Sequence, residues 1–337
     1  FSDITHLEKI SVAAYCIMKI SAFAKDASRW PFPRVIAHRG GGSHAPENTI
    51  MGIKASSDVG MCAIEFDVML SSNKVPMLMH DEELKRTVRD TSVDGKQFNQ
   101  LTSEKLSTVD VGQYFNPELK NVFIPTLEEV INHCVEHKVF MNVEIKPAAG
   151  FEIRTGIAVA EQLVEHIDRL TAAGVPPLIS SFQFCSLKAA KEVAPMIHRG
   201  YLIDEPLASL PNWKAQVVEL EAMAVHVNAD HLQREQVREI NDMGLAVMAF
   251  TVNDLARANE LLEWGVDSIC TDQVMDFLPL SRRLSEDFTD GQDEEDQQPV
   301  AVEDTCIEMH CGGNTIDSSR TIVSECEGML TEVPIVC

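Results

Sequence analysis

The chain has 337 residues, of which 45% are hydrophobic and 24% charged, and its formal net charge is −24 at pH 7. This composition is typical of a folded protein that buries a substantial core, and it excludes disorder of the whole chain. The negative charge argues against a nucleic-acid partner, because such binding depends on Lys and Arg neutralising phosphates. It also disfavours strong binding to anionic membranes.

The first predicted element is an N-terminal helical extension over residues 1–29. The segment 10–24 is apolar, but Lys19 interrupts it. No run of the chain reaches the roughly 18 apolar residues that a membrane span requires, so we expect no stable membrane insertion. We interpret the segment as a packed amphipathic helix; the alternative is the remnant of a signal peptide, which Ala-Phe-Ala at 22–24 would suit.

From residue 30 to about residue 280, short runs rich in Val, Ile, Leu, Met and Phe alternate with longer stretches of helical period. This alternation is typical of βαβ units. Strands are expected at 35–40, 62–70, 75–81, 139–147, 177–182, 197–203, 224–228, 245–252 and 268–272. Helices are expected at 46–58, 126–137, 156–173, 184–194, 212–221, 232–243 and 254–263. Apolar runs buried on both faces favour a parallel barrel over an antiparallel sandwich.

Nine strands are one more than the eight of a (β/α)8 barrel. The second and third are separated only by SSNK, which is too short for a helical crossover, so these two are candidates for a hairpin. The sequence leaves open which strand lies outside the barrel. In the helix expected at 46–58, Pro46 suits the first turn and Glu47 complements the positive end of the helix dipole.

Two segments break the alternation. Residues 87–125 are polar and follow a His-Asp pair, so we expect an inserted lobe or long loop there. Residues 281–337 carry fourteen Asp or Glu against three Lys or Arg, which is typical of an acidic, mobile tail. This tail is a candidate for binding a protein partner of unknown identity.

The nine cysteines divide between the barrel segment, the N-terminal extension and the tail, where four of them lie. Lone cysteines in apolar runs, such as Cys62 and Cys270, are expected to be small buried hydrophobic residues. The tail cysteines leave secretion open as a localisation, although a cytoplasmic protein is the expectation.

Charged side chains interrupt two of the expected strands. Residues two apart in a strand face the same side, so Glu65 and Asp67 project together, as do Glu144 and Lys146. Barrel enzymes carry their chemistry at the carboxyl ends of the strands, where the three carboxylates would converge on one divalent cation. Unpaired charges inside apolar runs are costly to bury, which favours a shared ionic site over separate solvated strand ends.

His38 and His80 each end an apolar run, and each is followed by a charged residue, Arg39 and Asp81. A lone histidine at a strand end is usually structural, but two with charged neighbours favour acid–base catalysis near neutral pH. The guanidinium of Arg39 and the ammonium of Lys146 suit phosphate oxygens. The set predicts metal-assisted cleavage of a phosphate ester, in which positive charge stabilises the phosphoryl oxygens.

The order of these motifs resembles the glycerophosphodiester phosphodiesterase family, whose compact bacterial cytosolic type is nearest. HRG, followed after five residues by PENT, occupies 38–49. ExD, HD, ExK, TVN and TD then follow in family order at 65–67, 80–81, 144–146, 251–253 and 271–272. The resemblance covers residues 30–280.

This resemblance implies a TIM barrel with a small insertion after the HD strand, one Mg²⁺ or Ca²⁺ ion on three carboxylates, an acid–base pair of histidines and two cations on the phosphate. The implied metal ligands are Glu65, Asp67 and Glu144. The implied acid–base pair is His38 and His80, and the implied phosphate-binding cations are Arg39 and Lys146. The implied substrate is a small glycerophosphodiester, such as glycerophosphocholine or glycerophosphoethanolamine, hydrolysed to sn-glycerol 3-phosphate and an alcohol.

The sequence departs from the family pattern at Phe250, where many members have Trp. Trp264 is a candidate replacement, and Glu128 is a third candidate for the substrate pocket. Attack by the glycerol 2-hydroxyl through a cyclic phosphate is favoured over direct attack by water, because two histidines can exchange acid and base roles between the steps.

A lysophospholipase D or a sphingomyelinase D-like enzyme is the alternative within the enzyme class. The acidic residues of the insertion, Asp90, Asp94 and Glu104, favour a soluble diester over a lipid. Outside that class, the chain would be a barrel kept as a binding scaffold, but no catalytic histidine or metal carboxylate of the pattern is missing.

Overall fold

A computed structural model of the protein describes residues 29–290. The predicted N-terminal helix and most of the predicted acidic tail lie outside these residues. The strands are β1 (Val35–Ala37), β2 (Ala63–Leu70), β3 (Pro76–Leu78), β4 (Phe140–Ile145), β5 (Leu178–Ser181), β6 (His198–Ile203), β7 (Ala224–Asn228), β8 (Ala246–Phe250) and β9 (Ser268–Thr271). Each of the nine expected strands is present.

Eight parallel strands close into a barrel. Their order is β1-β9-β8-β7-β6-β5-β4-β2, and β2 pairs with β1 to complete the ring. The ninth strand, β3, runs antiparallel to β2 with Val68 opposite Leu78, so it forms the outer arm of a hairpin. The predicted TIM barrel is therefore confirmed, and β3 is the strand outside it.

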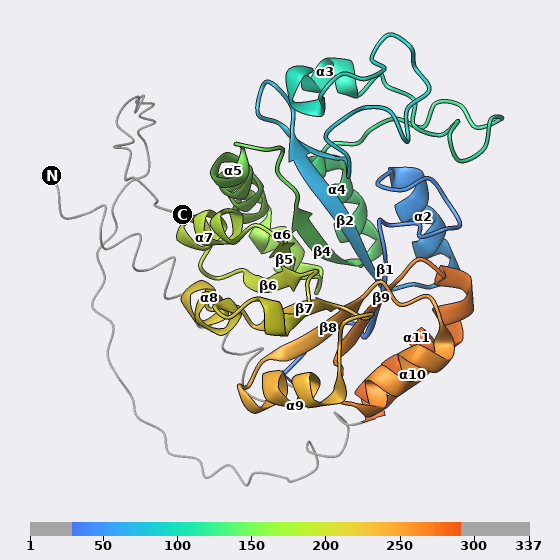
Figure 1. Ribbon diagram of the computed structural model, residues 1–337. Coiled ribbons are helices and arrows are strands. Elements are labelled where there is room, and N and C mark those ends of the chain that lie inside the picture. The colour runs from blue at the N-terminus through green and yellow to red at the C-terminus, as the bar shows by residue number, and fades with distance from the viewer. Residues whose placement is uncertain (1–28, 291–337) are drawn as a thin grey trace, which may run out of the picture. The chain divides into compact units, whose positions relative to one another are not determined.

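The helices surround the ring of strands (Figure 1). They are α2 (Ile50–Val59), α4 (Leu127–His137), α5 (Glu152–Glu165), α6 (Ile167–Ala172), α7 (Phe184–Val193), α8 (Trp213–Leu220), α9 (Arg234–Asp242), α10 (Leu255–Glu263) and α11 (Val274–Asp290). The sequence predicted α5 and α6 as one helix. It did not predict α11, which continues ten residues past the expected end of the barrel domain at 280.

The prediction that a helix opens at Pro46 is wrong, because α2 begins at Ile50. Asn48 has a left-handed backbone (φ 54°), which prevents helical geometry at that point. Thr49 is the N-cap instead, and its hydroxyl accepts a hydrogen bond from the Gly52 amide at 3.0 Å. The PENT segment is therefore a loop that precedes the helix.

The core has two layers that follow from strands buried on both faces. One lies between the strands and the helices, and the other fills the barrel. At the amino end of the barrel, Phe32 stacks on Phe140 with ring centroids 4.4 Å apart, and Trp30 meets Phe32 edge-on. Aromatic packing closes this end, so the opposite, carboxyl end is the one open to a ligand.

A lobe follows β3 and has a small core of its own, which includes Val93, Phe98 and Leu106. It contains a 3₁₀ turn (Phe98–Gln100) and α3 (Ser103–Leu106), and the chain returns from it to α4. The lobe contains the 87–125 segment where the sequence indicated an insertion. Figure 1 shows it above the barrel, on the side of β2.

Two further observations concern cysteines and membranes. Cys270 is buried as expected. Cys62, which directly precedes the first residue of β2, is exposed. Within residues 29–290, none of the helices combines the length and the apolar character needed to cross a membrane.

Candidate active site

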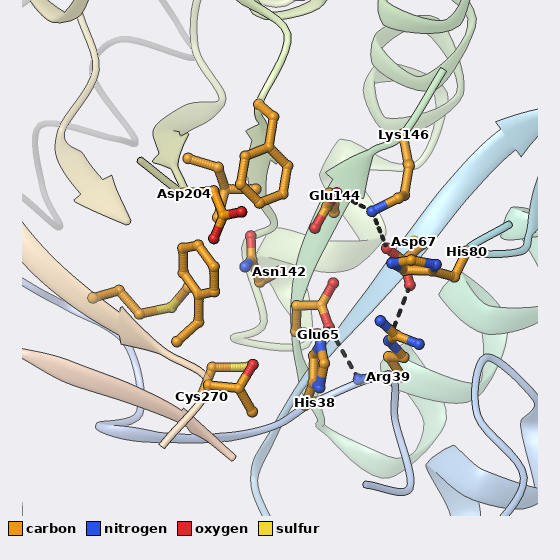
Figure 2. A pocket seen from close by; sticks show the side chains of 15 residues that line it. His38, Arg39, Glu65, Asp67, His80, Asn142, Glu144, Lys146, Asp204 and Cys270 are labelled. Carbon is orange, nitrogen blue, oxygen red and sulfur yellow. Dashed lines mark hydrogen bonds and ion pairs between the residues drawn. The ribbon is translucent and has the colours of Figure 1, made fainter. Parts of the chain in front are cut away.

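Three carboxylates meet at the carboxyl ends of two neighbouring strands. Glu65 and Asp67 lie on β2 and Glu144 lies on β4, where it pairs in register with Asp67. One ligand atom from each residue lies within 4.8 Å of the others, and all three residues are buried. Figure 2 shows the carboxylates pointing into a shared space. The period-two pattern of the strands thus brings together the acids that the sequence proposed as metal ligands.

The carboxylates differ in how readily they ionise. Burial, followed by the charge of Asp67, raises the pKa of Glu144 to about 8, and the same causes raise the pKa of Glu65 well above its ordinary value. Burial alone would raise the pKa of Asp67, but nearby cations and a hydrogen bond from Asn48 hold it below its ordinary value. Burial therefore favours the protonated forms of Glu65 and Glu144, and an added positive charge would favour their ionised forms.

The donor set fits a divalent cation. Glu65 accepts a hydrogen bond from the Arg39 amide at Oε2 (3.0 Å), while its buried Oε1 has no hydrogen-bond partner. A buried carboxylate oxygen without a partner is costly, and a hard cation would satisfy it. Glu65, Asp67 and Glu144 are therefore the residues that could hold an ion such as Mg²⁺ or Ca²⁺.

His38 directly follows β1, and residues from much later in the chain hold its ring at the same, carboxyl end of the barrel. Its Nδ1 lies 2.6 Å from Oδ1 of Asp272, which directly follows β9, the neighbour of β1. Asn253 Nδ2 donates to the second oxygen of Asp272 at 2.9 Å. A carboxylate at Nδ1 favours a proton on that nitrogen, which leaves Nε2, 3.9 Å from Glu65 Oε2, available for proton transfer.

His80 has a similar partner from the adjacent position in the chain. Its Nδ1 lies 2.6 Å from Asp81 Oδ1. Burial lowers the pKa of His80, against the raising effects of Asp67 and Asp81. The ring is therefore neutral near neutral pH and can accept a proton at Nε2.

Two cations flank the carboxylates. Arg39 Nε lies 3.8 Å from Asp67 Oδ2, and Lys146 Nζ lies 3.6 Å from Asp67 Oδ1 and 3.3 Å from Glu144 Oε1. Figure 2 shows Arg39 and Lys146 approaching Asp67 from opposite sides. Glu47 fixes the far end of Arg39 by accepting a hydrogen bond from Nη1 at 2.9 Å. The buried Arg39 Nε has no hydrogen-bond partner, so it remains available to an anion.

The three carboxylates, the two histidines and the two cations line a cavity of about 350 Å³ at the carboxyl end of the barrel. Its apolar wall contains Phe182, Leu202, Met248 and Phe250, and the Phe182 and Phe250 rings meet edge-on at 5.7 Å. The cavity is large enough for a small organic phosphate. Phe250, a predicted pocket residue, is among the residues that line this cavity.

Two predicted pocket residues are not among those that line the cavity. Glu128 is exposed in the first turn of α4, which lies outside the ring of strands. Trp264 ends α10 and packs against the outer core, with the Arg257 guanidinium 4.6 Å from its ring centroid. Both residues lie on the helical layer, which separates them from the barrel mouth.

Sequence reasoning assigned no role to several residues of the site. Asp272, Asn253 and Asn48 belong to TD, TVN and PENT, so their motifs were noted, but their partners were not. Asn48 Nδ2 donates to Asp67 Oδ2 at 2.8 Å, which orients that carboxylate. The lining residues Leu202, Asp204 and Met248 carry no motif, and only the closed barrel brings them to the cavity.

The sequence model of the glycerophosphoryl diester phosphodiesterase family matches residues 38–275. The chain therefore belongs to the glycerophosphodiester phosphodiesterase family. The glycerophosphodiester phosphodiesterase of Caldanaerobacter subterraneus is 30% identical and aligns with 74% of this chain and 98% of its own length. That of Bacillus subtilis is 27% identical, over 70% of this chain and 82% of its own length.

A solved structure with a bound product is also similar to this glycerophosphodiester phosphodiesterase domain. It is an Oleispira antarctica phosphodiesterase in complex with sn-glycerol-3-phosphate, with a TM-score of 0.65 and 29% sequence identity. The similarity covers 74% of this chain and 97% of that one. Family, named relatives and fold agree, so the enzyme class is glycerophosphodiester phosphodiesterase.

Proposed function

We propose that the enzyme hydrolyses small glycerophosphodiesters, such as glycerophosphocholine and glycerophosphoethanolamine, to sn-glycerol 3-phosphate and an alcohol, with one Mg²⁺ or Ca²⁺ ion. The observation that carries the proposal is the meeting of three buried carboxylates within 4.8 Å, in a cavity also lined by two histidines and two cations. The family match and the product bound to the Oleispira antarctica relative support this substrate class.

When bound, the ion supplies positive charge that stabilises the developing negative charge on the phosphoryl oxygens. Arg39 and Lys146 bind the same phosphate from the two sides of Asp67. Arg39 offers the planar donor fork that matches phosphate oxygens, and Lys146 acts as a point charge. Both side chains are largely buried, so little reorganisation is needed when the substrate arrives.

The histidines move the protons. In the first step, His80 Nε2 accepts the proton of the glycerol 2-hydroxyl while that oxygen attacks phosphorus. His38 enters this step as the imidazolium, with Nδ1–H held by Asp272, and donates its Nε2 proton to the departing alcohol. The products are the free alcohol and a cyclic glycerol phosphate. In the second step the roles reverse: His38 takes a proton from water, and His80 returns its proton to the 2-oxygen. Phosphorus NMR of slowed reactions tests this route, and a persistent absence of the cyclic phosphate would favour direct attack by water.

The decisive experiment measures glycerol 3-phosphate released from glycerophosphocholine, with EDTA and then with excess Mg²⁺ or Ca²⁺. We expect activity that EDTA abolishes and that metal restores, because the ion would supply the positive charge that stabilises the phosphoryl oxygens. His38→Ala and His80→Ala should each lose most of the turnover. Activity that is indifferent to EDTA would overturn the metal dependence.

A parallel assay with lysophosphatidylcholine tests the lipid alternative. One observation favours that alternative: Phe115 and Phe123 of the inserted lobe expose 40% and 42% of their surfaces. Exposed aromatic residues suit contact with lipid. Choline release from the lipid alone would assign the enzyme to the lysophospholipase D type.

A further inference from the structure

Arg86 lies in the inserted lobe and joins two carboxylates that serve different parts of the active site. Its Nη1 and Nη2 donate to the two oxygens of Glu47 at 2.7 and 2.6 Å, and its Nε donates to Asp81 Oδ2 at 2.7 Å. Arg86 is not among the residues that line the catalytic cavity. Its contacts therefore act on the site only through these two acids.

Each of the two acids holds a residue of the proposed chemistry. Asp81 accepts at Oδ1 from His80 Nδ1, so it uses one oxygen for the histidine and the other for Arg86. Glu47 Oε1 accepts from Arg39 Nη1 as well as from Arg86. The contacts form one continuous chain from the His80 ring to the Arg39 guanidinium.

Glu47 is also held by its backbone. The Tyr114 hydroxyl, which comes from the same inserted lobe, accepts a hydrogen bond from the Glu47 amide at 2.8 Å. Burial alone would raise the pKa of Glu47, but hydrogen bonds from Arg86 and the charge of Arg39 hold it below its ordinary value. The lobe thus contacts the PENT loop at both the carboxylate and the backbone of one residue.

The geometry requires an arginine. Only a planar guanidinium presents parallel donors to one carboxylate and a further donor at Nε to a second one. A lysine ammonium is a single point of charge on a flexible stem, so it cannot hold both acids in fixed directions. Because the Arg86 side chain is 46% exposed, its ion pairs are screened and contribute little to global stability.

We propose that Arg86 is a positioning residue that fixes His80 and Arg39 relative to each other, so that the inserted lobe sets the geometry of the catalytic site. The inference rests on the proposed hydrolysis of glycerophosphodiesters. Arg86 holds Asp81 for the proton-accepting ring and Glu47 for the phosphate-binding guanidinium. Without Arg86, the side chain of each acid contacts only the residue that it orients, and nothing in this chain of contacts fixes His80 relative to Arg39.

The test compares Arg86→Ala with Arg89→Ala in the metal-loaded enzyme, using glycerophosphocholine. Arg89 is exposed, lies three residues further on and contacts only nearby backbone carbonyls, so it is a matched control. We expect Arg86→Ala to lower kcat by about 10- to 100-fold and to raise KM, since misplacement by about 1 Å costs rates of that order. Arg89→Ala should have the kcat and KM of the wild-type enzyme. The wild-type enzyme and both variants should unfold at similar temperatures.

Two further measurements separate positioning from a general loss of structure. Methylguanidinium added to Arg86→Ala should restore part of kcat, whereas Arg86→Lys should stay impaired despite its charge. Arg86→Ala combined with Asp81→Asn should lose less activity than the sum of the two single losses, because the part of the Arg86 effect that passes through Asp81 and His80 is already lost in Asp81→Asn. Fully additive losses, or an Arg86→Lys enzyme as active as wild type, would overturn the role of Arg86.

The outcomes also separate this role from the proposed function. If the wild-type enzyme does not hydrolyse glycerophosphodiesters, the proposed function fails. If it does, and Arg86→Ala has unchanged kcat and KM, only the positioning role fails.

Discussion

At the scale of single residues, each proposed catalytic histidine is oriented by a carboxylate, but the two carboxylates come from different distances along the chain. Asp81 is the next residue after His80, whereas Asp272 lies 234 residues from His38. The sequence therefore showed a charged neighbour for His80, but it offered no reason to pair His38 with Asp272. That pairing depends on β9 lying beside β1 in the closed barrel.

The Asp272 contact leads to a first prediction at this scale. Asp272→Asn replaces an acceptor by a group that also donates, so His38 no longer has a fixed tautomer with its proton on Nδ1. We expect kcat to fall by about 100-fold or more, as found for triad carboxylates replaced by amides, with a small effect on unfolding. The measurement is steady-state hydrolysis of glycerophosphocholine, with exposed Asp276→Asn on α11 as the control. An unchanged kcat would show that Asp272 does not orient the ring.

At the scale of elements, the sequence predicted all nine strands because apolar runs between polar stretches are a local signal. It could not choose the strand outside the barrel, since that choice depends on the pairing of β2 with both β1 and β4. The start of α2 was misplaced because Asn48 takes a left-handed backbone and uses its side chain to hold Asp67. The contact between Asn48 and Asp67 therefore outweighs the local helix propensity of the PENT segment.

Helix packing gives a prediction that runs against helix propensity. In an exposed helix, Gly→Ala stabilises by about 1 kcal/mol. In α5, however, a Cβ on Gly156 would lie 2.3 Å from the Ser186 carbonyl oxygen in α7. The two helices must separate to accept it, so we expect Gly156→Ala to destabilise the fold by about 1–3 kcal/mol.

Urea unfolding checks this prediction through the midpoint and the slope. Gly174→Ala is the comparison, because that glycine has a left-handed backbone (φ 76°) but nothing within 4 Å of an added Cβ. It should show only the backbone cost of roughly 1–2 kcal/mol. A Gly156→Ala protein as stable as wild type would mean that the contact between α5 and α7 adjusts without cost.

At the scale of the whole molecule, a chain with net charge −24 gathers three cations at the site where the phosphate is proposed to bind. Arg39, Lys146 and Arg86 come from a loop after β1, from the end of β4 and from the inserted lobe, and they meet around buried acids. The net charge of the sequence argues against a nucleic-acid partner, but it does not show that cations gather at this one place. The raised pKa values of Glu65 and Glu144 predict that the stability of the fold depends on pH and on a bound cation.

The window for that dependence follows from the pKa shifts. Burial raises the pKa of Glu144 from its ordinary 4.5 to about 8, and that of Glu65 also rises. Between these pKa values the folded state binds more protons than the unfolded state. The free energy of unfolding therefore falls as pH rises towards about 8. Below 6.5 the opposite effect operates, because burial lowers the pKa of several histidines, such as His226 to about 3. Between pH 6.5 and about 8, the two carboxylates therefore determine how the stability of the fold changes with pH.

In this window we expect the metal-free protein in EDTA to lose stability as pH rises, by up to about 1.4 kcal/mol per pH unit for each proton released. Mg²⁺ competes with the same protons, so the increase in unfolding temperature that it causes should grow from pH 6.5 to about 8. Thermal unfolding at a series of pH values, with EDTA or excess Mg²⁺, measures both effects. In Glu144→Gln the pH slope in EDTA should become shallower and the Mg²⁺ effect smaller. If Mg²⁺ stabilised the wild-type protein equally across the window, these carboxylates would not be the groups that bind it.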